Sequence, residues 1–206
     1  SCTFQGNYCG NDGGAISATP SGVGSLLAFE VDSCLFADNR ADDRGAGIWY
    51  RVSSDATAQV VIKNSRFANN RAGGQGGAIF ARSSFDAIAN DTLANCAFIG
   101  NQTDGTSIIN DGEGGAVFLR GSQNGNRNHL IVNCLFAENS ASERGGAIGT
   151  TSTVSSPGTL NTTILNCTFS ANSTSGAGGA IHAEGSEGEN TTAVVNSILW
   201  GNTAGG

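Results

Sequence analysis

The sequence predicts an all-β fold: a right-handed parallel β-helix (solenoid) of about six and a half coils, each 30–38 residues long with about three short strands. Two motifs predict it. A block of the form Asn/Ser-Cys/Ser-x-Phe-x-x-Asn recurs along the chain and ends in the variant NSILWGN, and a tetrad close to Gly-Gly-Ala-Ile follows each of the first six blocks. We therefore expect residues 1–206 to form one domain, either an excerpt of a longer solenoid or a filament subunit.

The block spacing sets the length of a coil. Successive blocks lie 32, 31, 31, 38, 33 and 30 residues apart, measured at their second residues, which are Cys2, Cys34, Ser65, Cys96, Cys134, Cys167 and Ser197. A period near thirty residues is typical of a repeat array. The fourth repeat is longer because it carries an insertion around residues 104–110, and the register resumes after it. The insertion is therefore expected to bulge out of a fixed coil.

Strands, not helices, are expected within each coil. Gly, Ser, Thr and Asn fill every repeat, and no segment keeps a 3.6-residue apolar period. Short β-branched runs such as QVVI and TTIL precede the blocks and are typical of strands. Parallel crossovers within one sheet are almost always right-handed, which predicts the handedness of the solenoid.

Alternation along the strands predicts which side chains fill the interior. One inward column consists of Phe4, Phe36, Phe67, Phe98, Phe136 and Phe169, continued by Leu199. The aliphatic residues three positions before the Cys/Ser position, and those that end the tetrads, are also expected to point inward. The Asn that opens most blocks suits a left-handed bend. The Asn that ends each block predicts a ladder of stacked amides at Asn7, Asn39, Asn70, Asn101, Asn139 and Asn172, and at Asn202 in the last block.

Five of the six cysteines occupy an inward position that Ser65 and Ser197 take in other coils. We therefore expect mostly buried thiols, because parallel stacking holds neighbouring Cβ atoms too far apart for an unstrained disulfide. Cys9 lies off this column, and a Cys2–Cys9 bridge is an open alternative.

Composition excludes several classes of partner. A net charge of −7 with a single lysine argues against nucleic acid, since phosphate contacts need clustered cations. No run of about eighteen apolar residues is present, so no membrane insertion by this segment is expected. His129 and His182 share no metal-ligand spacing, and neither a metal nor a cofactor is predicted.

One acidic cluster is a candidate catalytic or cation site. Asp104, Asp111 and Glu113 lie in and after the insertion, and Glu143 and Arg144 lie one coil further on. The favoured interpretation is a solvated loop, because the calcium-loop spacing is absent. We assign no catalytic residue and expect no enzyme, with a polysaccharide lyase or hydrolase as the alternative.

An outward pattern after the tetrads is not required by coil building. Two rows on one outer face form the candidate binding site, an aromatic row of Trp49, Phe80 and Phe118 and a cationic row of Arg51, Arg82 and Arg120. Exposed aromatics and stacked like charges are both unfavourable, so something is expected to cover this face. The alternatives are the chain's own polar loops, such as residues 121–128, a neighbouring subunit or another surface protein, or a glycan.

The FxxN blocks followed by GGAI tetrads resemble the repeats of the chlamydial polymorphic outer membrane proteins. The resemblance covers the whole chain and implies a secreted or surface-displayed β-helix, often adhesive and often part of a longer polypeptide. Two coils depart from the pattern: the second has Gly-Ala-Gly-Ile, and the seventh has Leu-Trp where Phe is expected.

These observations lead to one functional hypothesis and one alternative. The hypothesis is an extracellular or cell-surface structural protein, an adhesin-like spacer or a filament subunit that stacks end to end through uncapped β-helix ends and uses its aromatic/Arg face. The alternative is a β-helix that binds or cleaves polysaccharide.

Overall fold

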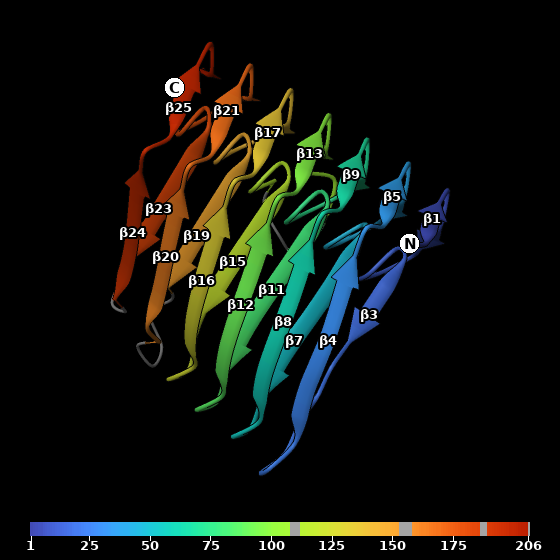
Figure 1. Ribbon diagram of the computed structural model, residues 1–206, viewed down its shortest axis with the longest axis vertical. Helices are drawn as coiled ribbons and strands as arrows, with labels where there is room; N and C mark the ends of the chain where they lie inside the picture. Colours follow the sequence, from blue (N-terminus) through green and yellow to red (C-terminus); the bar gives the residue numbers. More distant parts are fainter. Residues whose placement is uncertain (108–111, 153–157, 186–188, 206) are drawn as a thin grey trace.

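The computed structural model describes residues 1–107, 112–152, 158–185 and 189–205, and all the regular elements in these ranges are β-strands. The strands stack as successive coils of a solenoid, with the two ends of the chain at opposite ends of the stack (Figure 1). All strand pairs are parallel and join equivalent residues of neighbouring coils, for example Phe36 with Phe67. The predicted all-β parallel solenoid is confirmed.

Four sheets run along the stack, numbered here in the order in which the chain visits them. The first contains β1 (Thr3–Gln5), β5 (Leu35–Ala37), β9 (Arg66–Ala68), β13 (Ala97–Ile99), β17 (Leu135–Ala137), β21 (Thr168–Ser170) and β25 (Ile198–Trp200). The second contains β2 (Tyr8–Cys9), β6 (Arg40–Ala41), β10 (Arg71–Ala72), β14 (Gln102–Thr103), β18 (Ser140–Ala141), β22 (Ser173–Thr174) and β26 (Thr203–Ala204).

The other two sheets are built from longer strands. The third contains β3 (Ile16–Ala18), β7 (Ile48–Ser53), β11 (Ile79–Ser84), β15 (Val117–Gly121), β19 (Ile148–Ser152) and β23 (Ile181–Gly185). The fourth contains β4 (Leu26–Asp32), β8 (Thr57–Lys63), β12 (Ile88–Ala94), β16 (Asn126–Val132), β20 (Leu160–Leu165) and β24 (Asn190–Val195). Each complete coil therefore has four strands, one more than predicted. The strands of the second sheet were missed because two residues are too few to show alternation.

Left-handed residues turn the chain at the ends of the first-sheet strands. The residue that opens each block has φ between 49° and 56° from Ser33 to Asn196, which confirms the predicted bend. A second left-handed position lies two residues after each Phe of the column, and after Leu199 in the last block, and is occupied by Gly6, Asp38, Asn69, Gly100, Glu138, Ala171 and Gly201. Gly and Asn adopt this conformation at the lowest cost, which explains their abundance in the blocks.

The phenylalanine column fills the interior behind the first sheet. From Phe4 to Phe169, successive ring centroids lie 4.5–4.8 Å apart with interplanar angles of 3–8°. All of these rings except Phe4 are fully buried, and they belong to one core cluster with Ile48, Ile62 and their equivalents. Burial of each ring contributes roughly 1.5–3 kcal/mol before entropy is subtracted.

The cysteines are free thiols, and Cys96, Cys134 and Cys167 are buried in this core as predicted. Cys2 is exposed and Cys9 is half-buried, and the alternative bridge between them is not formed. The thiol of Cys134 lies 3.4 Å from the backbone nitrogen of Cys96, in the place where Ser65 presents its hydroxyl to the Cys34 nitrogen. The column therefore also accepts hydrogen bonds from the backbone of the preceding coil.

The asparagine ladder joins all seven coils at the corner between the first and second sheets. Each Asn Nδ2 donates to the Oδ1 of the next Asn at 2.8–3.0 Å. The same Nδ2 donates to a Phe carbonyl of the preceding coil at 3.0 Å, as Asn101 does to Phe67. The backbone nitrogen of each Asn also donates to the next Oδ1, so the amide group uses both donors and accepts twice.

Asn101→Ala should therefore lower the free energy of unfolding by about 3–5 kcal/mol, because it leaves the buried Asn70 backbone nitrogen without its acceptor and removes the side-chain bonds to Asn70 and to the Phe67 carbonyl. Urea unfolding followed by circular dichroism would measure this loss. Asn69→Gly is the matched control, since Asn69 is exposed at φ 54°, where Gly is accepted, and its unfolding midpoint should stay close to wild type. Equal losses in the two variants would contradict a special role for the ladder.

Candidate functional site

The aromatic row lies on the outer face of the third sheet but is not open to solvent. Trp49, Phe80 and Phe118 pair in register, with ring centroids 6.4 and 6.0 Å apart, and form a cluster separate from the main core. Their exposed fractions are only 8%, 0% and 1%. The guanidinium of Arg44 lies 5.0 Å from the centre of the Phe80 ring.

The chain itself therefore packs against the aromatic row, which is the first of the three alternatives for what covers this face. The segment that reaches it includes Arg44 and comes just before the second tetrad, not from the predicted loop at residues 121–128. Gly149 belongs to the same packing, because a Cβ at this position would lie 2.7 Å from Cδ2 of Phe118. These rings are structural, and sequence alternation could not show what lies above them.

The cationic row lies on the same outer face and is half-buried. Arg51 pairs with Arg82 and Arg82 with Arg120, so three guanidinium groups follow each other on consecutive coils. Arg82 donates to Ser122 Oγ at 3.0 Å and to Gln123 Oε1 at 3.2 Å, which is the contact with the predicted polar loop. Burial, followed by the charges of Arg120 and Arg51, lowers the pKa of Arg82 to about 10. The structure thus brings the three predicted arginines together.

Asp104 and Glu113 of the acidic cluster form ion pairs with arginines of neighbouring coils. Glu113 is buried and lies 2.7 Å from Gln75 Nε2 and 3.5 Å from Arg144 Nη1, so the solvated-loop interpretation is wrong for this residue. Asp104 pairs with Arg71 at 2.6 Å. Asp111 lies outside the described residues. Among the residues that the structure describes, no group of three His, Cys, Asp or Glu side chains could hold a metal ion.

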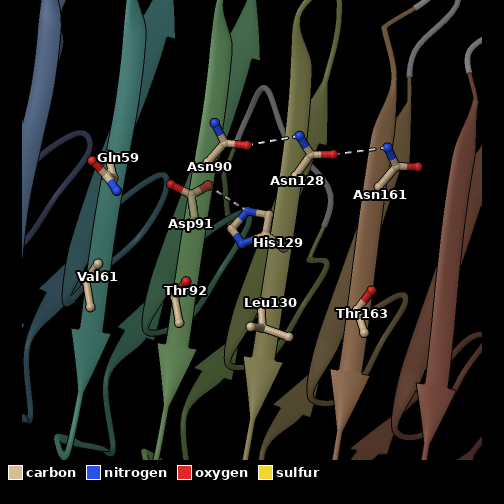
Figure 2. Close-up of a pocket in the computed structure, with 10 residues that line it drawn as sticks. All are labelled: Gln59, Val61, Asn90, Asp91, Thr92, Asn128, His129, Leu130, Asn161 and Thr163. Carbon is tan, nitrogen blue, oxygen red and sulfur yellow. Dashed lines mark hydrogen bonds and ion pairs between the residues drawn. The ribbon is translucent and has the colours of Figure 1, made fainter.

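A shallow groove of about 380 Å³ on the outer face of the fourth sheet is a site that sequence reasoning missed. Two parallel rows line it, as Figure 2 shows: Gln59, Asn90, Asn128 and Asn161 in one, and Val61, Thr92, Leu130 and Thr163 in the other. Asn128 Nδ2 donates to Asn90 Oδ1 at 3.0 Å, and Asn161 Nδ2 donates to Asn128 Oδ1 at 3.1 Å. The lining residues occupy outward positions of these strands, so alternation along the sequence could have identified them.

A charged cluster is buried inside the coils behind this groove. Arg127 and His129 on β16, Asp91 on β12 and Tyr50 on β7 are all at most 4% exposed. Arg127 Nη1 bonds Asp91 Oδ2 and lies 3.3 Å from the Tyr50 hydroxyl oxygen. His129 Nε2 lies 3.1 Å from Arg127 Nη1 and 3.0 Å from Asp91 Oδ2 (Figure 2 draws the latter contact). The cluster joins three coils and two sheets through the interior.

Burial dominates the ionisation of this cluster. It raises the pKa of Asp91 to about 6, although the Arg127 charge opposes this shift. It also lowers the pKa of His129 well below 6.5, helped by the charge of Arg127, and raises the pKa of Tyr50. His129 is therefore a neutral buried side chain at neutral pH. The side chains of Asp91 and His129 are at most 1% exposed, which makes the cluster structural.

A family model, the Chlamydia polymorphic membrane protein (Chlamydia_PMP) repeat, matches four segments of the chain: residues 1–19, 64–82, 133–151 and 166–184. The predicted resemblance is thus confirmed for the first, third, fifth and sixth coils. The other coils contain the departures in sequence: Gly-Ala-Gly-Ile in the second, the insertion in the fourth and Leu-Trp in the seventh. Repeats of this family suggest a surface-exposed outer membrane protein.

Comparisons with curated proteins and with solved structures gave no match. The part of the chain that the structure describes contains no helix long and apolar enough to cross a membrane.

The buried histidine predicts a pH-dependent stability. Below pH 6.5 the unfolded chain binds a proton at His129 that the folded chain does not, so stability from this residue is lost as pH falls. Between pH 7 and pH 5, wild type should lose about 2 kcal/mol of unfolding free energy relative to His129→Gln, measured by urea unfolding.

Thr162→Val is the control for this measurement. Thr162 pairs with His129 in the neighbouring coil and is buried, but it does not titrate. Its unfolding free energy should run parallel to wild type across the pH range. Parallel curves for His129→Gln and wild type would show that the folded protein binds the proton equally well.

Proposed function

We propose that this chain is part of a cell-surface structural protein in which the β-helix is an adhesin-like spacer. The four matches to the membrane-protein repeat carry the proposal. The structure adds a physical basis, because asparagine and phenylalanine columns run through successive coils. A stack held at every coil is stiff, and its length is set by the number of repeats.

Association through the ends of the stack is the second part of the proposal. β25 exposes Ile198, Leu199 and Trp200 by 63%, 51% and 75% of their surface. The backbone edge and apolar side chains of such a strand fit a further coil in parallel register. That coil can belong to the same polypeptide, which gives a longer spacer, or to a second copy, which gives a filament.

Surface display is tested with an epitope tag at Val23, which lies in a turn and is 86% exposed. Intact cells that produce the full-length tagged protein should bind the antibody because the turn faces the medium. Permeabilised cells measure the total amount of tag. Labelling that appears only after permeabilisation would overturn surface display.

Electron microscopy of the purified chain tests the filament. Fibres should lengthen with protein concentration if copies stack end to end, and deletion of residues 197–206 should abolish them because it removes β25 and β26. Monodisperse short rods at every concentration would remove the filament and leave the spacer.

Polysaccharide binding is the second candidate function, and the groove on the fourth sheet favours it. Side-chain amides donate and accept hydrogen bonds to sugar hydroxyls, and the neighbouring row supplies methyl groups. Asn128→Ala should weaken binding of any polysaccharide retained on an affinity column of the chain. Asn95→Gly is the control, since Asn95 also bonds its neighbour on the surface but lies at a turn outside the groove. Equal binding by both variants would exclude the groove.

A further inference from the structure

The arginine column of Arg51, Arg82 and Arg120 is a concentration of like charge that the fold does not need. Strand pairing places the three side chains on consecutive coils of the third sheet, about 4.7–4.9 Å apart at the backbone. Like charges directly opposite each other destabilise a sheet. In the following coils the same position holds Thr151 and Glu184, so the fold accepts other residues there.

Among the residues that the structure describes, no carboxylate forms an ion pair with this column, although the charge of Glu113 acts on Arg120 from a greater distance. Six of the ten cationic side chains form ion pairs within the described residues, and they are Arg40, Arg44, Lys63, Arg71, Arg127 and Arg144. The arginines of the column form none. The Nε atoms of Arg51 and Arg120 are buried and have no hydrogen-bond partner among the described residues. Burial and then the charges of Arg120, Arg51 and Arg44 lower the pKa of Arg82, so positive charge is in excess around the middle of the column. Burial and the charge of Arg44 also lower the pKa of Arg120, against the opposing charge of Glu113.

The rim of the column carries an exposed aromatic ring at a turn. Phe85 follows β11 at φ 54°, and its side chain is 43% exposed. The equivalent turn residues Ser54 and Gln123 have φ of 60° and 53°, so the backbone conformation belongs to the coil and only the exposed ring is particular to Phe85. The Arg51 guanidinium lies 6.0 Å from the centre of the Phe85 ring. The column therefore has an exposed apolar surface at one end, and Ser122 and Gln123 orient Arg82 in its middle.

We propose that Arg51, Arg82 and Arg120 bind an oxyanion, a sulfate or phosphate group, across neighbouring coils, with Phe85 contacting the molecule that carries it. Guanidinium groups offer paired N–H donors that match the oxygens of such groups. An anion here would satisfy the unpaired Nε atoms and remove the repulsion between the coils. The site goes beyond the proposed spacer function and does not depend on surface display.

The overall charge of the chain makes this site selective. With a net charge of −7, the surface as a whole repels acidic ligands. Binding of an anion therefore depends on the local column and not on a general basic surface. This separates the proposal from unspecific attraction and allows a matched control.

The test is isothermal titration of the purified chain, at constant ionic strength, with inorganic sulfate, inorganic phosphate, a sulfated oligosaccharide and its unsulfated equivalent. Arg82→Gln should weaken binding of the sulfated oligosaccharide at least tenfold. Arg66→Gln is the control, since Arg66 is exposed on the first sheet and forms no ion pair with the described residues, and it should bind as wild type. Equal weakening by the two variants, or equal binding of both oligosaccharides, would overturn the proposal.

Two further variants distinguish a free anion from one carried by a larger molecule, and both use conservative substitutions so that a loss of binding is not caused by misfolding. Phe85→Asn keeps a residue suited to positive φ and removes the ring, so it should weaken binding of the sulfated oligosaccharide while inorganic sulfate binds unchanged. Equal binding of inorganic and carried anions by wild type would assign the site to a free oxyanion. Arg82→Lys keeps the charge and loses the paired donors, so an affinity equal to wild type would contradict recognition by the guanidinium.

A stability measurement provides an independent check. Without anion, Arg82→Gln should melt at a higher temperature than wild type because it relieves repulsion with Arg51 and Arg120. Sulfate should raise the melting temperature of wild type more than that of the variant. A lower melting temperature for Arg82→Gln in buffer without oxyanions would show that the column stabilises the fold without a ligand.

Discussion

The hydrogen bonds of the asparagine ladder fix the register on which every other feature depends. The corner between the first and second sheets is buried, so the backbone groups there cannot form hydrogen bonds with water. Each Asn supplies two donors and accepts twice, and its partners lie in both neighbouring coils. A slip of one residue would break these bonds at every coil and turn each Phe out of the core. The coils can therefore stack only with equivalent residues above each other.

Such stacking has opposite consequences for apolar and charged side chains. For Phe, it gives a column of parallel rings that buries itself. For charged residues, it places side chains of the same charge next to each other unless the charge at that position changes from coil to coil. One outer column does alternate, with Asp12, Arg44, Gln75, Glu113 and Arg144 in order, and its members pair across coils. The arginine column does not alternate, which marks it as different from the columns that only hold coils together.

The features that were predicted from the sequence are those that repeat with the coil. The Phe and Asn columns, the left-handed bends and the buried thiols of Cys96, Cys134 and Cys167 follow from period and alternation alone, and the structure contains all of them. The two-residue strands of the second sheet are too short to be recognised by alternation. Arg44, which packs over the Phe80 ring, lies in an irregular segment, and alternation along strands does not predict the path of such a segment. The burial of Glu113 was not predicted for the same reason, since the residues that it contacts lie in other coils.

The charged cluster inside the coils was missed although its residues occupy inward positions. Asp91 lies two residues before Leu93, and Arg127 and His129 lie on the same face of β16 as Ile131, so alternation places them in the core. What the sequence lacks is the partner across the interior. Tyr50 is on the third sheet, and its position opposite Arg127 follows only from the closure of the coil.

The third sheet separates two groups of arginines that are treated in opposite ways. Tyr50 and Arg51 are neighbours on β7, with Tyr50 directed to the interior, where Arg127 lies, and Arg51 to the outer column. Inside, burying Arg127 without a counter-charge would be very costly, and Asp91 on the neighbouring strand of the fourth sheet neutralises it. Outside, Arg51, Arg82 and Arg120 are only half-buried, so water lowers the cost of leaving them unpaired. Of the two groups, only the outer one combines guanidinium groups that form no ion pair within the described residues with access to a solute, and these are the two properties that binding an anion requires.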